Sequence, residues 1–228
     1  MSGQESRSIG RGPAPNVSGM TSIDAITLEV SDLAAAERFY AKAFGLGSRL
    51  RLREAQEPTT GFRGYTLSLT VSQPADVDAL IGSAVDAGAT VLKPAAKSMW
   101  GYGGVVQAPD GAIWKVATSA KKDTGPATGR IDSIVLLIGA TDVGASRKCY
   151  LDQGFTVAKS FGRMYVEFAS AGDVKLGLYR RRALAKDAGV APEGSGSHRI
   201  VVNGAAQFTD PDGFAWAGSG QAGGQFGA

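Results

Sequence analysis

The sequence predicts an α+β protein whose two halves repeat one another. Three observations support this prediction: the glycine content is high, a strand–helix pattern occurs twice, and the same Pro-Asp-Gly turn follows later in each half. Glycine accounts for 32 of 228 residues, about twice the usual ~7%. Together with recurrent short apolar runs, this glycine content indicates a chain rich in turns and strands.

The second observation is the repeated strand–helix pattern. It covers Ile23 to Tyr40 (IDAITLEVSDLAAAERFY) and, with a two-residue insertion, Ile131 to Tyr150 (IDSIVLLIGATDVGASRKCY). In each copy an apolar run typical of a strand leads to an aspartate, Asp32 or Asp142. Aspartate is a preferred helix N-cap, and the apolar residues after it recur at helical spacing. Each copy therefore predicts a strand followed by a capped helix.

The repeated turn closes each half. The segments are Ala108 to Trp114 (APDGAIW) and Asp210 to Trp216 (DPDGFAW). Proline presets φ, aspartate bonds to the local backbone, and glycine adopts the left-handed conformation, so Pro-Asp-Gly favours a tight turn. We expect each turn to lead into a strand that carries the tryptophan, and we expect both tryptophans to pack against helices. The residues between the halves, 120–130, predict a polar linker.

The remaining elements follow from apolar periodicity. A further helix is expected from Pro74, a favoured first helical residue, to a stop at Gly88. The expected strands cover residues 25–30, 49–53, 65–71, 90–93, 104–107, 112–117, 134–138, 156–159, 165–168, 175–179, 199–202 and 214–217.

The two motifs, in this order and twice, resemble the glyoxalase/bleomycin-resistance/dioxygenase (vicinal oxygen chelate) superfamily over nearly all of residues 22–217. The resemblance implies paired βαβββ modules that form cupped mixed sheets with helices outside. Both halves depart from it: the first lacks a hairpin between Arg53 and Tyr65, and the second lacks room for a helix between Val202 and Phe208. How the shortened halves pair is left open. The predicted organisation is a disordered tail (1–20), a first domain (21–119), a linker (120–130), a shortened second domain (131–217) and a flexible tail (218–228).

The resemblance also implies positions for metal ligands, in the first and last strands of a half. Those positions hold Ala25, Lys115, Ser133 and Ala217. Alanine cannot ligate a metal, and a lysine ammonium would repel a cation. We therefore expect no metal or other cofactor. The alternative is a relocated metal site made of Glu29, His198 and Glu167, but one imidazole is few for a three- or four-ligand site.

Candidate site residues come from unusual positions in this pattern. Glu29, a carboxylate inside a strand, and His198, the single histidine, are candidate catalytic groups. For Glu29, an ion pair with Lys115 is an equal alternative, and His198 can also be a simple strand-edge residue. The glycine-flanked pair Trp100 and Tyr102 is expected in a loop, where large apolar groups often serve a ligand. Candidates to join this pair around one cleft are Tyr65, Phe62 and Phe161. The expected ligand-binding residues are Trp100, Tyr102, Tyr65, Glu29, Lys115 and Glu167.

These observations favour a protein that binds a small organic, aromatic molecule in a concave sheet without a metal, in a resistance or carrier role. The alternative is a metal-dependent glyoxalase-like lyase, isomerase or dioxygenase. A net charge of +3 with scattered basic residues argues against nucleic-acid binding. The one basic cluster, Arg180 to Arg182, is interpreted as a solvated strand end. The longest apolar run is far short of a membrane span. One cysteine excludes an internal disulfide and suits a cytoplasmic protein. A homodimer is possible in this superfamily.

Overall fold

The computed structural model describes residues 22–172, 174–204 and 207–218. The predicted tails, 1–20 and all but the first residue of 218–228, lie outside the described residues. Two large sheets and one two-stranded ribbon make up the β-structure of the described ranges. The fold is mixed α+β, as expected. None of the helices in these ranges is long and apolar enough to span a bilayer.

The strands fall into four modules, two of them complete βαβββ units. The second module contains β4 (Tyr65–Thr70), α2 (Pro74–Asp86), β5 (Thr90–Ser98), β6 (Gly101–Gln107) and β7 (Ile113–Thr118). The third contains β8 (Ser133–Ala140), α3 (Val143–Asp152), β9 (Val157–Phe161), β10 (Tyr165–Phe168) and β11 (Val174–Arg180). Together they form an eight-stranded sheet in the order β5-β6-β7-β4-β8-β11-β10-β9.

The first and fourth modules are the shortened ones. The first keeps β1 (Ile23–Val30), α1 (Leu33–Ala43), the 3-10 turn η1 (Gly47–Arg49) and β2 (Leu50–Glu54). The fourth keeps β13 (Ile200–Gly204), β14 (Phe208–Thr209) and β15 (Ala215–Gly218). They share a five-stranded sheet in the order β14-β15-β13-β1-β2.

The pairing of these modules answers how the shortened halves fit together. In each complete module the last strand lies parallel beside the first, as β7 does beside β4 and β11 beside β8. Because the first module has no hairpin, β2 takes that place and lies parallel beside β1. The two joints between halves are antiparallel, β4 with β8 and β1 with β13. Each sheet therefore contains strands from both halves. The predicted boundary between two domains describes the sequence repeat and stays a prediction as a division of the structure.

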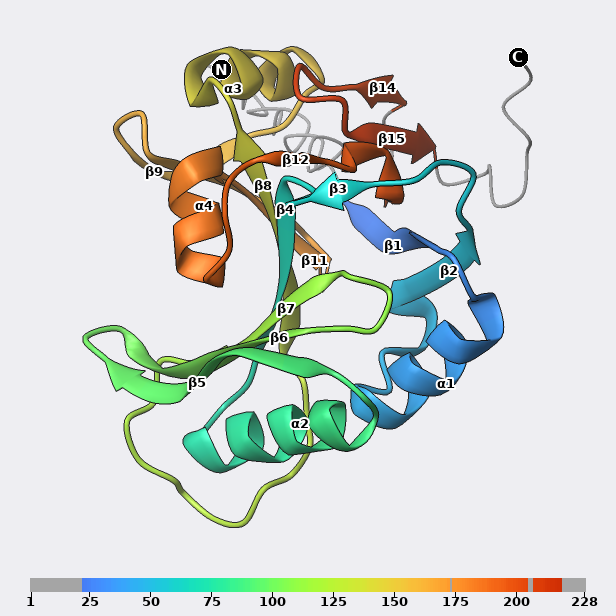
Figure 1. The fold of residues 1–228 in the computed structure, drawn as a ribbon. Coiled ribbons are helices and arrows are strands. Elements are labelled where there is room, and N and C mark those ends of the chain that lie inside the picture. Colours follow the sequence, from blue (N-terminus) through green and yellow to red (C-terminus); the bar gives the residue numbers. More distant parts are fainter. Residues whose placement is uncertain (1–21, 173, 205–206, 219–228) are drawn as a thin grey trace, which may run out of the picture.

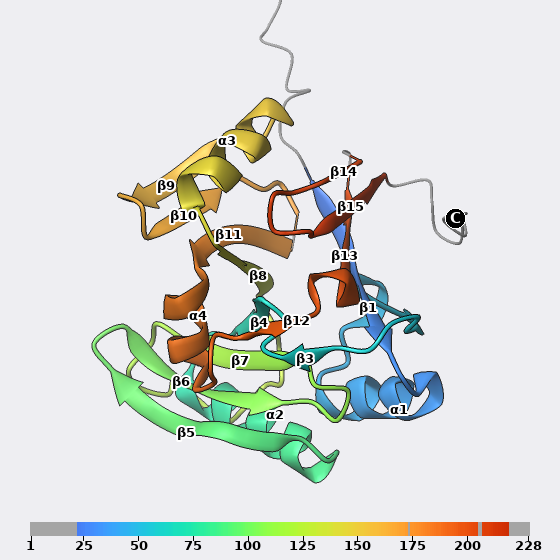
Figure 2. The ribbon, with the colours of Figure 1, turned by 45° about the horizontal axis from the view of Figure 1, so that its top comes forward.

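Short elements connect the modules. They are α4 (Arg181–Ala188), the 3-10 turn η2 (Ser197–Arg199), and the ribbon of β3 (Thr60–Gly61) with β12 (Gly194–Ser195). Figure 1 shows the eight-stranded sheet curving around α4, with α2 on its outer side. The turned view in Figure 2 agrees.

Two expectations about local structure were wrong in part. Of the three arginines interpreted as a solvated strand end, Arg180 does end β11 and is exposed, but Arg181 opens α4. Its guanidinium donates to the carbonyls of Phe62, Pro192 and Gly194. The loop expected at Trp100 is shorter than predicted, because β6 already begins at Gly101.

The repeat has a packing counterpart, in which a tryptophan, a tyrosine and an aspartate form a clasp in each half. Trp114 Nε1 donates to Tyr40 Oη at 3.3 Å, and Tyr40 donates to Asp110 at 2.7 Å. In the second half Trp216 Nε1 donates to Tyr150 Oη at 3.2 Å, and Tyr150 donates to Asp210 at 3.0 Å. Both tryptophans thus pack against helices, α1 and α3, as predicted. The turn glycines Gly111 and Gly213 have φ of +89° and +86°, which is the left-handed conformation expected of them.

Candidate functional site

The cup of the eight-stranded sheet is occupied by the chain itself. One face of this sheet packs on α2 and α3, which contact β6, β7 and β11, and its residues such as Trp114 and Leu136 belong to the main apolar cluster. The concave face instead receives α4, whose Leu184, Ala185 and Ala188 are buried in a second apolar cluster. That cluster also includes Phe62, Val105 and Ile113, with Leu137 and Tyr179 against it. The part of the expected site that lies on the eight-stranded sheet is thus largely covered by a helix.

Polar contacts hold α4 in the cup. Asp187 accepts from Lys115 Nζ at 2.8 Å, and Lys93 Nζ donates to the carbonyl of Lys186 at 2.8 Å. The expected pairing of Glu29 with Lys115 is therefore wrong, because Lys115 binds α4 and Glu29 lies on the other sheet.

A cavity of about 330 Å³ remains beside α4 on this concave face. It brings together Trp100, Tyr102 and Lys115 of the expected ligand-binding residues. Trp100 is 81% exposed. The Tyr102 hydroxyl is turned away, since it donates to Asp78 of α2 at 2.8 Å, and that hydrogen bond raises the pKa of Tyr102. The rings expected to join Trp100 do not: Tyr65 and Phe62 are buried in the apolar clusters, and Phe161 lies on β9.

A larger cavity of about 580 Å³ lies on the five-stranded sheet. Alternation along β1, β13 and β15 places Glu29, Val201 and Ala215 on one face of the sheet. The lining residues are Glu29, Arg53, His198, Val201, Gln207, Phe208, Thr209, Gly213, Ala215 and Trp216. This cavity therefore contains both candidate catalytic residues, Glu29 and His198.

The polar end of this cavity is an ion pair across neighbouring strands. Glu29 on β1 lies in register with Arg53 on β2. One carboxylate oxygen, Oε1, accepts from Arg53 Nη2 at 2.6 Å and from Nε at 3.0 Å. The Glu29 side chain is 8% exposed and that of Arg53 is 42% exposed. A carboxylate buried this deeply needs its partner, so Arg53, which the sequence did not single out, is part of the site.

The other groups of the cavity are a histidine and two rings. His198 lies in η2, and its Nε2 is buried without a hydrogen-bond partner among the described residues. Phe208 and Trp216 stack with ring centroids 5.3 Å apart and an interplanar angle of 10°. Register places both rings on the face opposite Glu29, where they pack against Tyr150 of α3. Both rings therefore belong to the core, and the apolar lining on the face of Glu29 is Val201 and Ala215.

The expected metal-ligand positions divide between the two sheets. Ala25 and Ala217 both pair with Asn203, so they lie in one row across β1, β13 and β15. The polar groups nearest this row satisfy each other, because Thr27 Oγ1 donates to Asn203 Oδ1 at 2.7 Å. On the other sheet, Ser133 Oγ lies 2.5 Å from Thr70 Oγ1. Nowhere in the described ranges do three His, Cys, Asp or Glu side chains gather as a metal site requires.

Glu167 and Tyr65, two of the predicted site residues, line neither the cavity beside α4 nor the cavity on the five-stranded sheet. Glu167 is on β10, which three strands separate from β7 and Lys115, or roughly 19 Å at about 4.8 Å per strand. It accepts from Tyr165 at 3.2 Å. It also lies on the other sheet from Glu29, so the relocated site of Glu29, His198 and Glu167 is not assembled. Tyr65 is buried against Phe214, and burial raises its pKa to about 12.

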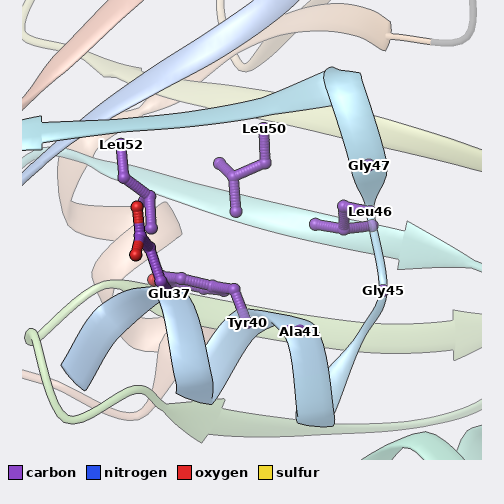
Figure 3. Close-up of a pocket in the computed structure, with 8 residues that line it drawn as sticks. All are labelled: Glu37, Tyr40, Ala41, Gly45, Leu46, Gly47, Leu50 and Leu52. Atoms are coloured by element: carbon purple, nitrogen blue, oxygen red, sulfur yellow. The ribbon is translucent and has the colours of Figure 1, made fainter. Parts of the chain in front are cut away.

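A third cavity, of about 490 Å³, lies between α1 and β2 (Figure 3). Leu46, Leu50 and Leu52 point into it, and Tyr40 and Glu37 line its helical side. β2 is an edge strand here, where a complete module would continue with two more strands. We interpret this groove as the space left by the missing hairpin.

Comparison with solved structures gives the fold. A variant of glyoxalase I from Zea mays matches with a TM-score of 0.56 at 13% identity, over 87% of this chain and 93% of that chain. The chain has the glyoxalase fold. A second variant of the maize protein matches with a TM-score of 0.54 at 14% identity, over 86% and 91% of the two chains. A Bacillus subtilis protein provisionally described as a dioxygenase matches with a TM-score of 0.51 at 14% identity, over 82% of this chain and 71% of that chain.

The glyoxalase fold does not by itself identify the chemistry. No family model and no curated protein matches the sequence. At 13–14% identity the similarity to the maize structures is one of fold alone. One fold supports many functions. The function must therefore be argued from the cavities of this particular glyoxalase fold.

Proposed function

We propose that this protein binds a small organic molecule with an aromatic ring in the cavity on the five-stranded sheet, without a metal, in a resistance or carrier role. The observation that supports the proposal is the convergence of Glu29, Arg53 and His198 with the apolar side chains of Val201 and Ala215 around one cavity. Ligand sites are typically concave, of 300–1,000 Å³, and apolar with a few convergent polar groups. This cavity fits that description.

The concave face of the eight-stranded sheet is the weaker candidate for the ligand. Its cavity is smaller, its acid Asp187 and base Lys115 neutralise each other, and its ring Trp100 stands mostly in solvent. A ring that stands in solvent keeps part of its surface exposed when a ligand stacks on it, so less of the contact is buried than in a pocket.

The alternative is a metal-dependent lyase, isomerase or dioxygenase with a relocated site. It is favoured by one observation, the presence of Glu29 and His198 in the same cavity. Against it, Arg53 already binds Glu29, and a cation would have to displace that guanidinium. Metal analysis of the purified protein, with thermal unfolding in added nickel, zinc or manganese, tests this alternative. Stoichiometric metal that is lost in His198→Ala would favour it over the proposal.

Binding of 2-naphthamide, measured by isothermal titration calorimetry, tests the proposed cavity. Two alanines form a matched pair, since Ala215 lines the cavity on the five-stranded sheet and Ala117 lines the one beside α4. Ala215→Leu fills the proposed site and is expected to weaken binding more than tenfold, while Ala117→Leu and Trp100→Ala change it less than twofold. The reverse pattern would move the ligand to the cup of the eight-stranded sheet.

A further inference from the structure

The charges around the cavity on the five-stranded sheet are predominantly positive. Arg51 and Arg53 alternate with leucines along β2, so both lie on the face that carries Glu29. Arg53 pairs with Glu29, whereas Arg51 is exposed and its strand neighbour is the uncharged Thr27. The face therefore carries one carboxylate against two guanidinium groups.

Arg53 keeps unused hydrogen-bonding capacity. A guanidinium has five N–H donors in a planar fork, and Glu29 takes only Nε and one Nη2 hydrogen through the single oxygen Oε1. Nη1 makes no hydrogen bond to a described residue, and the side chain is 42% exposed toward the cavity mouth. An arginine oriented from one side by a buried acid and open on the other can bind an oxyanion with a fixed geometry.

His198 is a second polar side chain that lines the cavity. Its Nε2 is buried and lacks a partner among the described residues. A buried polar atom without a partner is destabilising unless a ligand or water satisfies it. A ligand oxygen placed between His198 and Arg53 would meet this requirement.

Resting on the proposed function, we infer that the ligand is an organic anion, an aromatic molecule with a carboxylate or similar oxyanion. The oxyanion binds Arg53 and His198, and the ring packs on Val201 and Ala215. The carboxylate of Glu29 does not oppose this arrangement, because Arg53 neutralises it and Arg51 leaves the face positive overall. Charge-assisted hydrogen bonds of this kind are about twice as strong as neutral ones.

Three probes of the same shape and different charge test the inference by calorimetry at pH 7.5 and low salt: 2-naphthoate, 2-naphthamide and 2-naphthylmethylamine. We expect 2-naphthoate to bind at least tenfold more tightly than 2-naphthamide, and the ammonium probe to bind most weakly. Equal binding of all three, or tightest binding of the ammonium probe, would overturn the inference while leaving the proposed function intact. Absence of binding by any probe would overturn the proposed function itself.

Variants separate a specific site from general positive charge. Arg53→Gln alone leaves Glu29 buried without its partner and risks unfolding, so the double variant Glu29→Gln/Arg53→Gln retains a neutral hydrogen-bonded pair. We expect it to bind 2-naphthamide within threefold of the wild type and to lose the preference for 2-naphthoate. The control is Arg180→Gln/Arg182→Gln, which removes two exposed arginines from a cavity at the start of α4. If this control loses the preference instead, the anion binds there and the assigned site is wrong.

Discussion

The Tyr150 hydroxyl shows how much a single buried group carries in this fold. It donates to Asp210 and accepts from Trp216, and the aromatic rings of Phe155, Phe168, Phe208 and Trp216 surround it. Burial raises the pKa of Asp210, while hydrogen bonds from Phe214, Tyr150 and Asp212 oppose that rise. Burial also raises the pKa of Tyr150 well above its usual value, so the hydroxyl stays a neutral donor.

Tyr150→Phe should therefore lower the free energy of unfolding by about 1–3 kcal/mol, because Asp210 loses a donor and Trp216 Nε1 loses its acceptor in a dry environment. Urea unfolding at pH 7 measures the change. Tyr102→Phe is the matched control, since its hydroxyl bonds Asp78 at the surface, and it should change stability by less than about 0.5 kcal/mol. Equal losses in both variants would contradict the role assigned to the clasp.

Asp76 is a second residue whose environment sets its behaviour. It is fully buried at the start of α2 and accepts from Thr128 N, Thr128 Oγ1 and Gly129 N at 2.5–3.0 Å. Burial alone would raise the pKa of Asp76, but these hydrogen bonds outweigh it and the pKa is lowered. The predicted linker is thus anchored to α2 through this carboxylate and through Gln73, which accepts from Thr124 N at 2.8 Å.

A lowered folded-state pKa gives stability that is complete above the unfolded-state pKa, about 4, and is lost as the pH falls through the folded value. Asp76→Asn should therefore lower the free energy of unfolding by about 1–3 kcal/mol at pH 7, and the deficit should shrink below pH ~4. Urea unfolding at pH 7 and pH 3 checks both parts. The exposed Asp78→Asn on the same helix is the control, and a deficit that stayed constant with pH would refute the argument.

The residues of the candidate site were only partly predictable. Glu29 stood out because a carboxylate inside an apolar strand needs a partner, and the structure provides Arg53. Arg53 itself could not be chosen over other arginines, because the register of β1 with β2 depends on a hairpin that is missing. Phe208 and Trp216 meet only through the turn that joins β14 and β15, so their stacking was not visible as a sequence pattern.

At the scale of elements, α4 is the main departure from the sequence prediction. A local signal was present, since RRALAKDA consists largely of strong helix formers and Gly189 ends it in the left-handed conformation. The signal was missed because the three arginines resembled a solvated strand end. What no local pattern could give is the position of α4 in the cup, which depends on residues as distant as Phe62 and Ile113.

Leu184→Ala should be costly for this reason. Leu184 is fully buried between α4 and the concave face, and removing a buried leucine typically costs about 2–5 kcal/mol. The matched control on the same helix is Arg182→Ala, an exposed position expected to stay within about 0.5 kcal/mol. Thermal and urea unfolding of both variants measure the difference, and a Leu184→Ala protein as stable as the control would show that α4 does not pack in the cup.

At the scale of the whole molecule, the two halves are interleaved. The first half contains the strands up to β7, and the second half contains those from β8 onward. In each large sheet one strand of the first half pairs with one of the second, β4 with β8 and β1 with β13. The repeat, the turns and most strand positions were predictable because apolar alternation and Pro-Asp-Gly chemistry are local. The exchange of strands between halves was not, because it follows from two different truncations that only complement each other in space.

Neither half should fold alone. Fragments 1–124 and 125–228, produced separately, are expected to lack cooperative unfolding, because each leaves two sheet edges and their apolar faces uncovered. Produced together, they should form a 1:1 complex with the circular dichroism spectrum of the intact chain, measured after size-exclusion chromatography. An intact chain cleaved after folding at a protease site placed behind the exposed Lys122 is the control, and should stay associated. Cooperative unfolding of either isolated fragment would refute the prediction.

The position of α4 has a consequence for competition at the concave face of the eight-stranded sheet. A segment tied to the chain at both ends behaves as a resident ligand, with an effective concentration on the order of millimolar or higher. A free molecule must out-compete that resident before it reaches Lys115 or the sheet beneath. Metabolites that bind this face weakly are thus excluded by mass action, without a moving gate. Evolution of a new ligand site there would have to begin with substitutions that weaken the packing of α4.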